Sequence, residues 1–287
     1  MTKIAIIGAG AVGTSLAVAL QKHSSVTLLG RHTTSITYEE AQTSKKQDIK
    51  VHALSSESGQ FDVIWIAVKT YQLSHVIPHL NRIAHPNTIV ILAQNGYGQL
   101  DQLASYRAYQ AVVYISGQKK DNHVVHFRDQ TIHIQRDTHT EQLAETLSHT
   151  ELTLHLEENI EYKIWYKLLV NLGINTVTAL GRDTARVLKH HEMHTLCRKL
   201  LIEGQHIAQA EGITFHSTLV DEIMAIYQGY PDEMGTSMYY DTINHQPLEV
   251  DAIQGYLYHR AQHHQIHTPY LETTYTLLTY QNKKQGC

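Results

Sequence analysis

Three polar residues suited to a small-molecule site recur at every fourth position of one stretch, Lys167, Asn171 and Asn175. On a helix this spacing places all three on one face. The intervening residues are mostly apolar, so the helix is suited to burial, where an ammonium group and two amides need polar partners. A polar small molecule in a cleft between two domains would supply those partners. The alternative is the solvated face of an ordinary amphipathic helix.

A glycine-rich turn near the start of the chain has the spacing of a dinucleotide-binding loop. The apolar run Lys3–Ile7 predicts a short buried strand, and the helical pattern Ser15–Leu20 follows the turn. Gly8 permits the tight turn, Gly10 lets a pyrophosphate approach the backbone, and Gly13 allows close helix–strand packing. The free N–H groups of the helix N-terminus would face the phosphates. The alternative is a glycine turn that binds nothing. The predicted cofactor loop is Gly8, Ala9, Gly10, Ala11, Val12 and Gly13.

The residue after the second predicted strand indicates which dinucleotide is preferred. That strand, Val26–Leu29, leads to Arg31, and no Asp or Glu stands there to hold a ribose 2′-OH. A guanidinium can bind a 2′-phosphate through two hydrogen bonds. We therefore expect NADP(H) rather than NAD(H), the alternative for Arg31 being an ordinary solvated loop charge.

Four further residues are candidates for binding a cofactor or a substrate, because each lies at the end of a predicted strand or near the start of a predicted helix. Lys69 follows one strand, where a cation could reach the adenosine phosphates, and Asn95 follows the next, where its amide could reach the nicotinamide ribose or a substrate. Ser237 lies near a helix start, and Glu249 lies early in the last major predicted helix. The alternatives are a surface lysine, an Asn-Gly turn and two ordinary helix caps.

The first half of the chain alternates apolar strands with helical stretches, which predicts a parallel, doubly wound sheet. A helix is expected over Gln72–Ile83, and two segments, His123–Phe127 and Thr131–Ile134, are expected to pair as an antiparallel hairpin. The other expected strands are Ile49–Ala53, Phe61–Val68, Thr88–Leu92, Ala111–Ile115 and Leu152–Leu156.

Helical periodicity dominates from about Glu158 onward. The pattern predicts one long helix over Arg182–Glu211 that Gly212 closes, and further helices over Thr218–Tyr227 and Leu248–His264. We therefore expect an α/β protein with an N-terminal Rossmann domain, residues 1–160, followed by an all-helical domain, residues 161–287. A cleft between two such domains favours an enzyme over a bare binding module.

Composition excludes several classes of function. The chain has 287 residues and a net charge of −4, with no basic stripe for nucleic acid. No apolar run is long enough for a membrane span, and the absence of a signal-peptide pattern predicts a cytoplasmic protein.

Two cysteines, Cys197 and Cys287, do not make a disulfide framework. Some of the 22 histidines fall at helical spacing, but we expect a solvated helix face rather than a metal site.

Taken together, these positions resemble the ketopantoate reductase (2-dehydropantoate 2-reductase) family almost from end to end. The resemblance rests on the glycine loop and on Arg31, Lys69 with Gln72, Gln94-Asn95-Gly96, Lys167-Asn171-Asn175 and Thr236-Ser237-Met238 with Glu249. It implies an N-terminal Rossmann domain, a helical C-terminal domain and NADPH-dependent reduction of 2-dehydropantoate to (R)-pantoate, a step toward pantothenate and coenzyme A.

The resemblance also implies a role for each matching residue. Lys167 would be the general acid that protonates the developing alkoxide. Asn95 would contact both cofactor and substrate, and Asn171, Asn175 and Ser237 would bind the substrate's hydroxyl and carboxylate groups. Arg31 and Lys69 would bind the 2′-phosphate, with Gln72 beside them, and Glu249 would hold the nicotinamide ribose.

This chain departs from the family pattern at several substrate-contacting positions. Met234 stands where an Asn is common, Thr236 replaces a Ser, and Asp183-Thr184-Ala185 replaces a stretch that often carries another Asn. The family's Ile-Asn-Gly is Ile253-Gln254-Gly255 here. The alternatives are therefore a reductase of another 2-keto acid or a non-catalytic NADP(H)-binding regulator. The helical domain could carry a homodimer interface.

Overall fold

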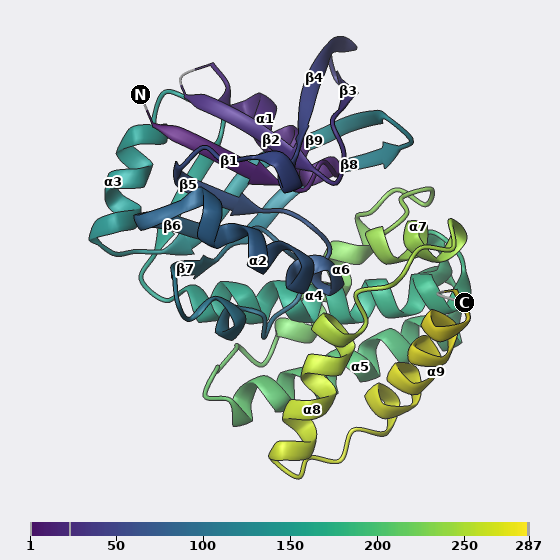
Figure 1. Ribbon diagram of the computed structural model, residues 1–287. Coiled ribbons are helices and arrows are strands. Elements are labelled where there is room, and N and C mark those ends of the chain that lie inside the picture. Colours follow the sequence, from purple (N-terminus) through teal and green to yellow (C-terminus); the bar gives the residue numbers. More distant parts are fainter. Residues whose placement is uncertain (1, 23, 286–287) are drawn as a thin grey trace. The chain divides into compact units, whose positions relative to one another are not determined.

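The computed structural model describes residues 2–22 and 24–285 (Figure 1). Its contacts divide the chain into two compact units. The first runs to Asn95 and resumes from Gln99 to Ile160, and the second comprises Gly96–Gly98 and the chain from Glu161 onward. The terminal Cys287 lies outside the described residues.

A sheet of ten strands organises the first unit, within the part of the chain that the structure describes. Its spatial order is β10-β9-β3-β4-β2-β1-β5-β6-β7, and β8 pairs with β9. The stretch from β4 to β7 is entirely parallel, as a doubly wound Rossmann sheet requires. The strands are β1 (Lys3–Ile7), β2 (Ser25–Gly30), β3 (Thr34–Glu40), β4 (Lys45–Ala53), β5 (Phe61–Ile66), β6 (Ala84–Leu92), β7 (Arg107–Gln110), β8 (Val112–Lys120), β9 (His123–Gln135) and β10 (Thr153–Glu157).

Helices cover both faces of this sheet (Figure 1). Successive residues of β1 point to opposite faces, so Ile6 packs in a core with residues of α1 and α3, whereas Ile7 packs in a core with residues of α2. Both side chains are almost fully buried. The covering helices are α1 (Ala11–Leu20), α2 (Leu73–Ile83) and α3 (Thr138–Leu147), with short 3₁₀ turns at η1 (Leu54–Ser56), η2 (Thr70–Gln72) and η3 (Leu100–Leu103).

The predicted hairpin between His123–Phe127 and Thr131–Ile134 is wrong. Both segments belong to the single strand β9, which continues through Asp129 in the left-handed region at φ 63°. The chain instead reverses at Asp121, at φ 52°, so that β8 and β9 form the antiparallel hairpin. Strands β3 and β7 had not been predicted, and β3 pairs antiparallel to β4 at one side of the parallel strands.

The second unit is built from helices, and its first helix carries the polar stripe seen in the sequence. The single helix predicted over Arg182–Glu211 is wrong, because Arg182 adopts φ 50° and ends one helix, and His190 is extended. Gly212 closes the next helix at φ 85°, as predicted. The elements are α4 (Ile160–Gly181), η4 (Ala185–Lys189), α5 (His191–Ala210), α6 (Leu219–Gln228), α7 (Ser237–Ile243), η5 (Asp251–Gly255), α8 (Tyr256–His263) and α9 (Pro269–Gln285).

The helix predicted over Leu248–His264 also differs from the structure. A π-helical turn, η5, precedes α8, and the Gly255 amide donates to the carbonyl of Val250 five residues back at 2.8 Å. Glu249 lies before this turn rather than inside the last major helix, which is α9. Single π-turns often mark functional positions in helices.

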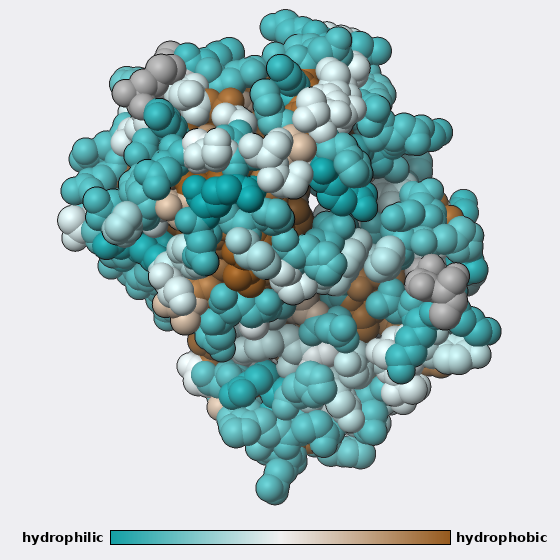
Figure 2. Space-filling view, viewed as in Figure 1, coloured by the Kyte–Doolittle hydropathy of each residue, from teal (hydrophilic) through white to brown (hydrophobic). Residues whose placement is uncertain are grey.

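The surface seen in Figure 2 is mostly hydrophilic. Within residues 2–22 and 24–285, no helix combines the length and the apolar character needed to cross a membrane. Cys197 is buried in α5, where burial raises the pKa of its thiol to about 12, so it is a packing residue rather than a reactive thiol.

Candidate active site

The glycine loop has the geometry needed for a backbone phosphate site. Gly8 has φ 119°, and a Cβ there would lie 2.6 Å from the carbonyl carbon of Ala67, so only glycine fits. A methyl group on Gly13 would overlap the carbonyl oxygen of Gly8. By contrast, a Cβ on Gly10 would meet nothing within 4 Å, which leaves open space beside the backbone at the start of α1. The first amides of that helix have no intrahelical acceptor, and these features suit a pyrophosphate.

The register of the parallel strands places the other first-unit candidates at the same edge of the sheet. Ile7 pairs with both Leu29 and Ile66, and Ile66 pairs with Leu92. The residues that follow these strand ends therefore emerge side by side in the order β2, β1, β5, β6. They are Arg31, the glycine loop, Lys69 and Asn95, so the structure brings these candidates to one edge, where ligands of α/β sheets bind.

Side-chain contacts order the loops at this edge. The backbone N–H of Lys69 donates to Oε1 of Gln72 at 3.3 Å, which fixes the turn that presents the lysine. Gln94 Nε2 donates to the carbonyl of Val68 at 2.8 Å and joins the loop after β6 to the loop after β5. Arg31 is exposed, and Asn95 is partly exposed, so both can be reached by a ligand.

In the second unit, the predicted stripe lies on α4. Lys167 and Asn171 are partly exposed, and Asn175 is buried with 4% of its surface exposed. Although part of the Lys167 side chain reaches the surface, desolvation by the surrounding atoms lowers the pKa of its ammonium to about 8. Such a group is mostly protonated at pH 7 and gives up its proton more readily than an ordinary lysine.

Helix α7 starts against the same helix, α4. The hydroxyls of Thr236 and Thr178 lie 2.8 Å apart, and Thr236 Oγ1 accepts the backbone N–H of Tyr239 as the N-cap. Thr236 therefore caps α7 and packs against α4. Ser237, the next residue, is exposed at the start of α7.

Contacts near η5 had not been predicted from the sequence. Gln254, the residue that replaces the family's Asn, is fully buried and donates through Nε2 to Thr176 Oγ1 at 2.8 Å. This bond joins η5 to α4 beside Asn175. Glu249, two residues before η5, is buried with 6% of its surface exposed. No local pattern signals the contact between Gln254 and Thr176, because 78 residues separate them.

The segment Gly96–Gly98 is part of the second unit although it follows β6 of the first. Gly96 has φ 85°, and a Cβ there would lie 2.5 Å from the carbonyl oxygen of Ala252. Tyr97 donates its backbone N–H to that carbonyl at 2.9 Å and its hydroxyl to Glu161. The sequence indicated a turn after Asn95, and the structure shows that this turn requires glycine for close approach.

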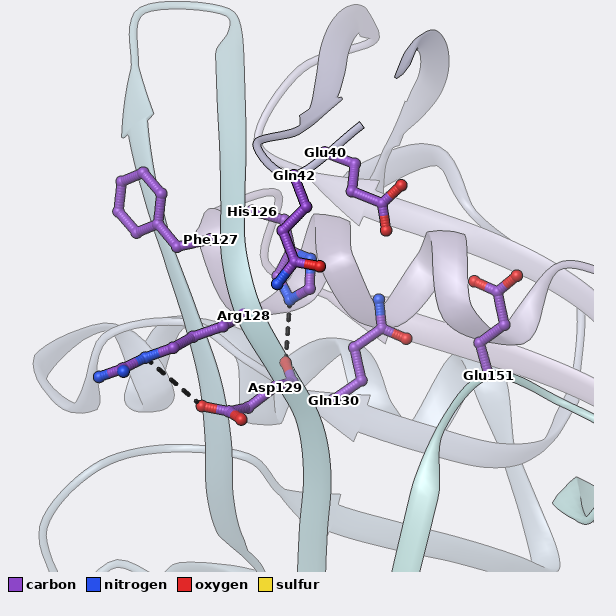
Figure 3. A pocket seen from close by; sticks show the side chains of 8 residues that line it. All are labelled: Glu40, Gln42, His126, Phe127, Arg128, Asp129, Gln130 and Glu151. Carbon is purple, nitrogen blue, oxygen red and sulfur yellow. Dashed lines mark hydrogen bonds and ion pairs between the residues drawn. The ribbon is translucent and has the colours of Figure 1, made fainter. Parts of the chain in front are cut away.

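A cavity of about 200 Å³ lies elsewhere in the first unit and contains none of the predicted site residues (Figure 3). There His126 lies at hydrogen-bonding distance, 2.9 Å, from the carbonyl of Asp129. Across the described ranges, no group of three or more His, Cys, Asp or Glu side chains is placed to hold a metal ion. The cavity is lined by Glu40, Gln42, His126, Phe127, Arg128, Asp129, Gln130 and Glu151.

Comparison with known proteins gives consistent matches over both halves of the chain. The family model described as ketopantoate reductase PanE/ApbA matches residues 4–138, and its C-terminal counterpart matches residues 159–281. A 2-dehydropantoate 2-reductase of Mycobacterium tuberculosis is 30% identical over 286 residues, which cover 96% of this chain and 97% of that protein.

Solved structures extend the comparison to the fold. A dimeric ketopantoate reductase from Staphylococcus aureus has 52% sequence identity and a TM-score of 0.95, with 99% of both chains covered. A D-mandelate dehydrogenase solved with NADH and anilino(oxo)acetate has a TM-score of 0.88 and covers 99% of this chain and all of that one. Its identity is 23%, so this second likeness concerns the fold alone.

Proposed function

Because the chain belongs to the ketopantoate reductase family, an oxidoreductase family, we propose that it reduces 2-dehydropantoate to (R)-pantoate with NADPH. The observation that supports this most directly is Lys167, whose pKa is lowered to about 8 on the helix face that also carries Asn171 and Asn175. A lysine whose pKa lies closer to 7 than usual, on the same helix face as two amides, is suited to donate a proton to a small polar substrate.

The proposed cofactor fits the first unit. The open backbone beside Gly10 and the N-terminus of α1 would receive the pyrophosphate, and Arg31 with Lys69 would receive the 2′-phosphate. No acidic residue follows β2 to bind a ribose 2′-OH, which favours NADP(H) over NAD(H). When bound, the reduced nicotinamide supplies a hydride to the keto carbon of the substrate.

Lys167 would act as the general acid. As negative charge develops on the keto oxygen, the ammonium stabilises that charge and then transfers its proton to the oxygen. Asn171, Asn175 and Ser237 would hold the substrate's hydroxyl and carboxylate groups. Asn95 would contact both cofactor and substrate, and Glu249 would hold the nicotinamide ribose.

The two halves of the chain would divide this work. In the proposal, residues 1–160 bind the cofactor, and residues 161–287 bind the substrate and supply the acid. Since the Staphylococcus aureus relative is described as dimeric, we also propose a homodimer for this chain. Sedimentation velocity at several protein concentrations would test the assembly separately from activity.

The experiment that tests the function is the loss of NADPH absorbance with 2-dehydropantoate, measured for the wild type and Lys167→Ala. Removal of a positioned general acid should lower kcat by about 10² or more. Lys199→Ala, which removes an exposed lysine of α5, is the matched control and should leave kcat unchanged. Equal turnover by wild type and Lys167→Ala would refute the assigned acid.

The substrate is tested by the same assay with a panel of 2-keto acids. Preference for 2-dehydropantoate supports the proposal, whereas preference for another acid would make the chain a reductase of that acid. Tight NADPH binding without turnover of any keto acid would instead indicate a regulator.

A further inference from the structure

A second cation, from a strand far along the chain, lies against the glycine loop. The ammonium of Lys119, near the end of β8, donates to the carbonyl oxygen of Ala9 at 2.6 Å, across 110 residues of sequence. Ala9 lies between two of the glycines of the cofactor loop, and Lys119 itself is exposed. The ammonium is therefore held beside the loop and remains open to a ligand.

The pairing of β8 with β9 explains why this lysine faces the loop. Lys119 pairs with Val124, and paired residues of an antiparallel ladder point to the same face of the sheet. Val124 is fully buried in the core that includes residues of α1, so Lys119 projects toward the side on which α1 lies. A register shift between Ser116 and Gly117 precedes this pair and sets the orientation of the strand end.

The same corner holds the end of β2. A Cβ on Gly30 would lie 3.6 Å from the Cβ of Ala9, so the residue before Arg31 lies against the loop residue that Lys119 contacts. Desolvation lowers the pKa of Lys119, and the positive charge of Arg31 lowers it further. Two cations near each other repel, and an anionic group bound between them would relieve that repulsion.

We propose that Lys119 is a specificity-determining residue that binds the 2′-phosphate of NADPH together with Arg31. The inference rests on the proposed use of a phosphorylated dinucleotide and adds a residue to that site. Because NADH differs from NADPH only in lacking this phosphate, Lys119 contributes to the choice between the two cofactors. The proposed phosphate contact gives a role to a lysine near the end of β8 that lies against the cofactor loop 110 residues earlier.

The test compares nucleotide binding by the wild type, Lys119→Gln and Lys119→Arg, with Lys120→Gln as the matched control. Lys120 is the next residue, is also exposed, and points to the opposite face of the strand. Dissociation constants for NADPH and NADH are measured by fluorescence titration, and those for 2′-AMP and 5′-AMP by calorimetry. Circular dichroism and Tm establish that each variant is folded.

We expect Lys119→Gln to raise the Kd for NADPH and for 2′-AMP about tenfold or more, the effect of a lost hydrogen bond to a charged group. The Kd values for NADH and 5′-AMP should change by less than about twofold, and Lys119→Arg should retain most of the preference. If Lys119→Gln weakened the binding of all four ligands equally, Lys119 would only support the loop, and the inference would be overturned. Unchanged affinity for all four ligands would overturn it as well, because Lys119 would then have no part in binding. Failure of the wild type to bind NADPH would instead refute the proposed cofactor.

Discussion

At the scale of single residues, the lowered pKa of Lys167 leads to a prediction about pH. The acid must carry its proton to act, so kcat/KM should be constant below about pH 7 and fall as pH rises through about 8. Above that value the decline approaches tenfold per pH unit, because the protonated fraction falls by that factor. In Lys167→Arg the guanidinium stays protonated, so whatever activity remains should lack this decline. A wild-type profile that is flat to pH 10 would contradict the assigned role.

The glycine loop allows a paired prediction about stability and binding. A methyl group on Gly10 meets no atom within 4 Å, so Gly10→Ala should keep the wild-type Tm and still weaken NADPH binding by blocking the phosphate. A methyl group on Gly13 would overlap the Gly8 carbonyl, so Gly13→Ala should cost about 1–3 kcal/mol of stability as α1 shifts. Thermal melting and NADPH titration of both variants separate the effects. Normal NADPH binding by Gly10→Ala would show that no phosphate approaches there.

At the scale of elements, a carboxylate from α5 caps the start of α9. Glu203 is buried and accepts the backbone N–H groups of Tyr270 and Leu271, at 3.1 and 2.7 Å. Burial raises the pKa of this carboxyl, and the two amide bonds partly oppose that shift. Glu203→Ala should cost about 1–3 kcal/mol, because the fully buried Leu271 amide loses its acceptor.

The control for this cap is Glu272→Ala. Glu272 is exposed in the first turn of the same helix, so its removal should cost only a few tenths of a kcal/mol through the helix dipole. Urea denaturation of both variants measures the difference. Equal destabilisation by the two substitutions would show that Glu203 is not a specific cap.

The sequence predicted those helices and strands correctly whose pattern lies within one short stretch of residues. The strand–loop–helix unit around Gly8 and the helix that carries Lys167 follow from spacing within a few turns, and both are present in the structure. The segment from Arg182 to His190 is not α-helical because Arg182 adopts a left-handed conformation and His190 is extended, and the hydrophobic pattern signals neither conformation. The pairing of β8 with β9, and the contact of Lys119 with Ala9, depend on residues distant in sequence. Periodicity carries no information about such contacts.

At the scale of the whole molecule, the net charge leads to a prediction about how solubility depends on pH. Its net charge is −4 at pH 7, and its isoelectric point is about 6.6. We expect electrophoretic mobility to change sign near pH 6.6 and light scattering to show a solubility minimum there, because repulsion between molecules is then weakest. Solubility should recover at about pH 5.5, because the net charge is then positive. A monotonic rise in scattering from pH 8 to pH 5.5 would indicate acid unfolding instead of charge neutralisation, and circular dichroism over the same series distinguishes the two.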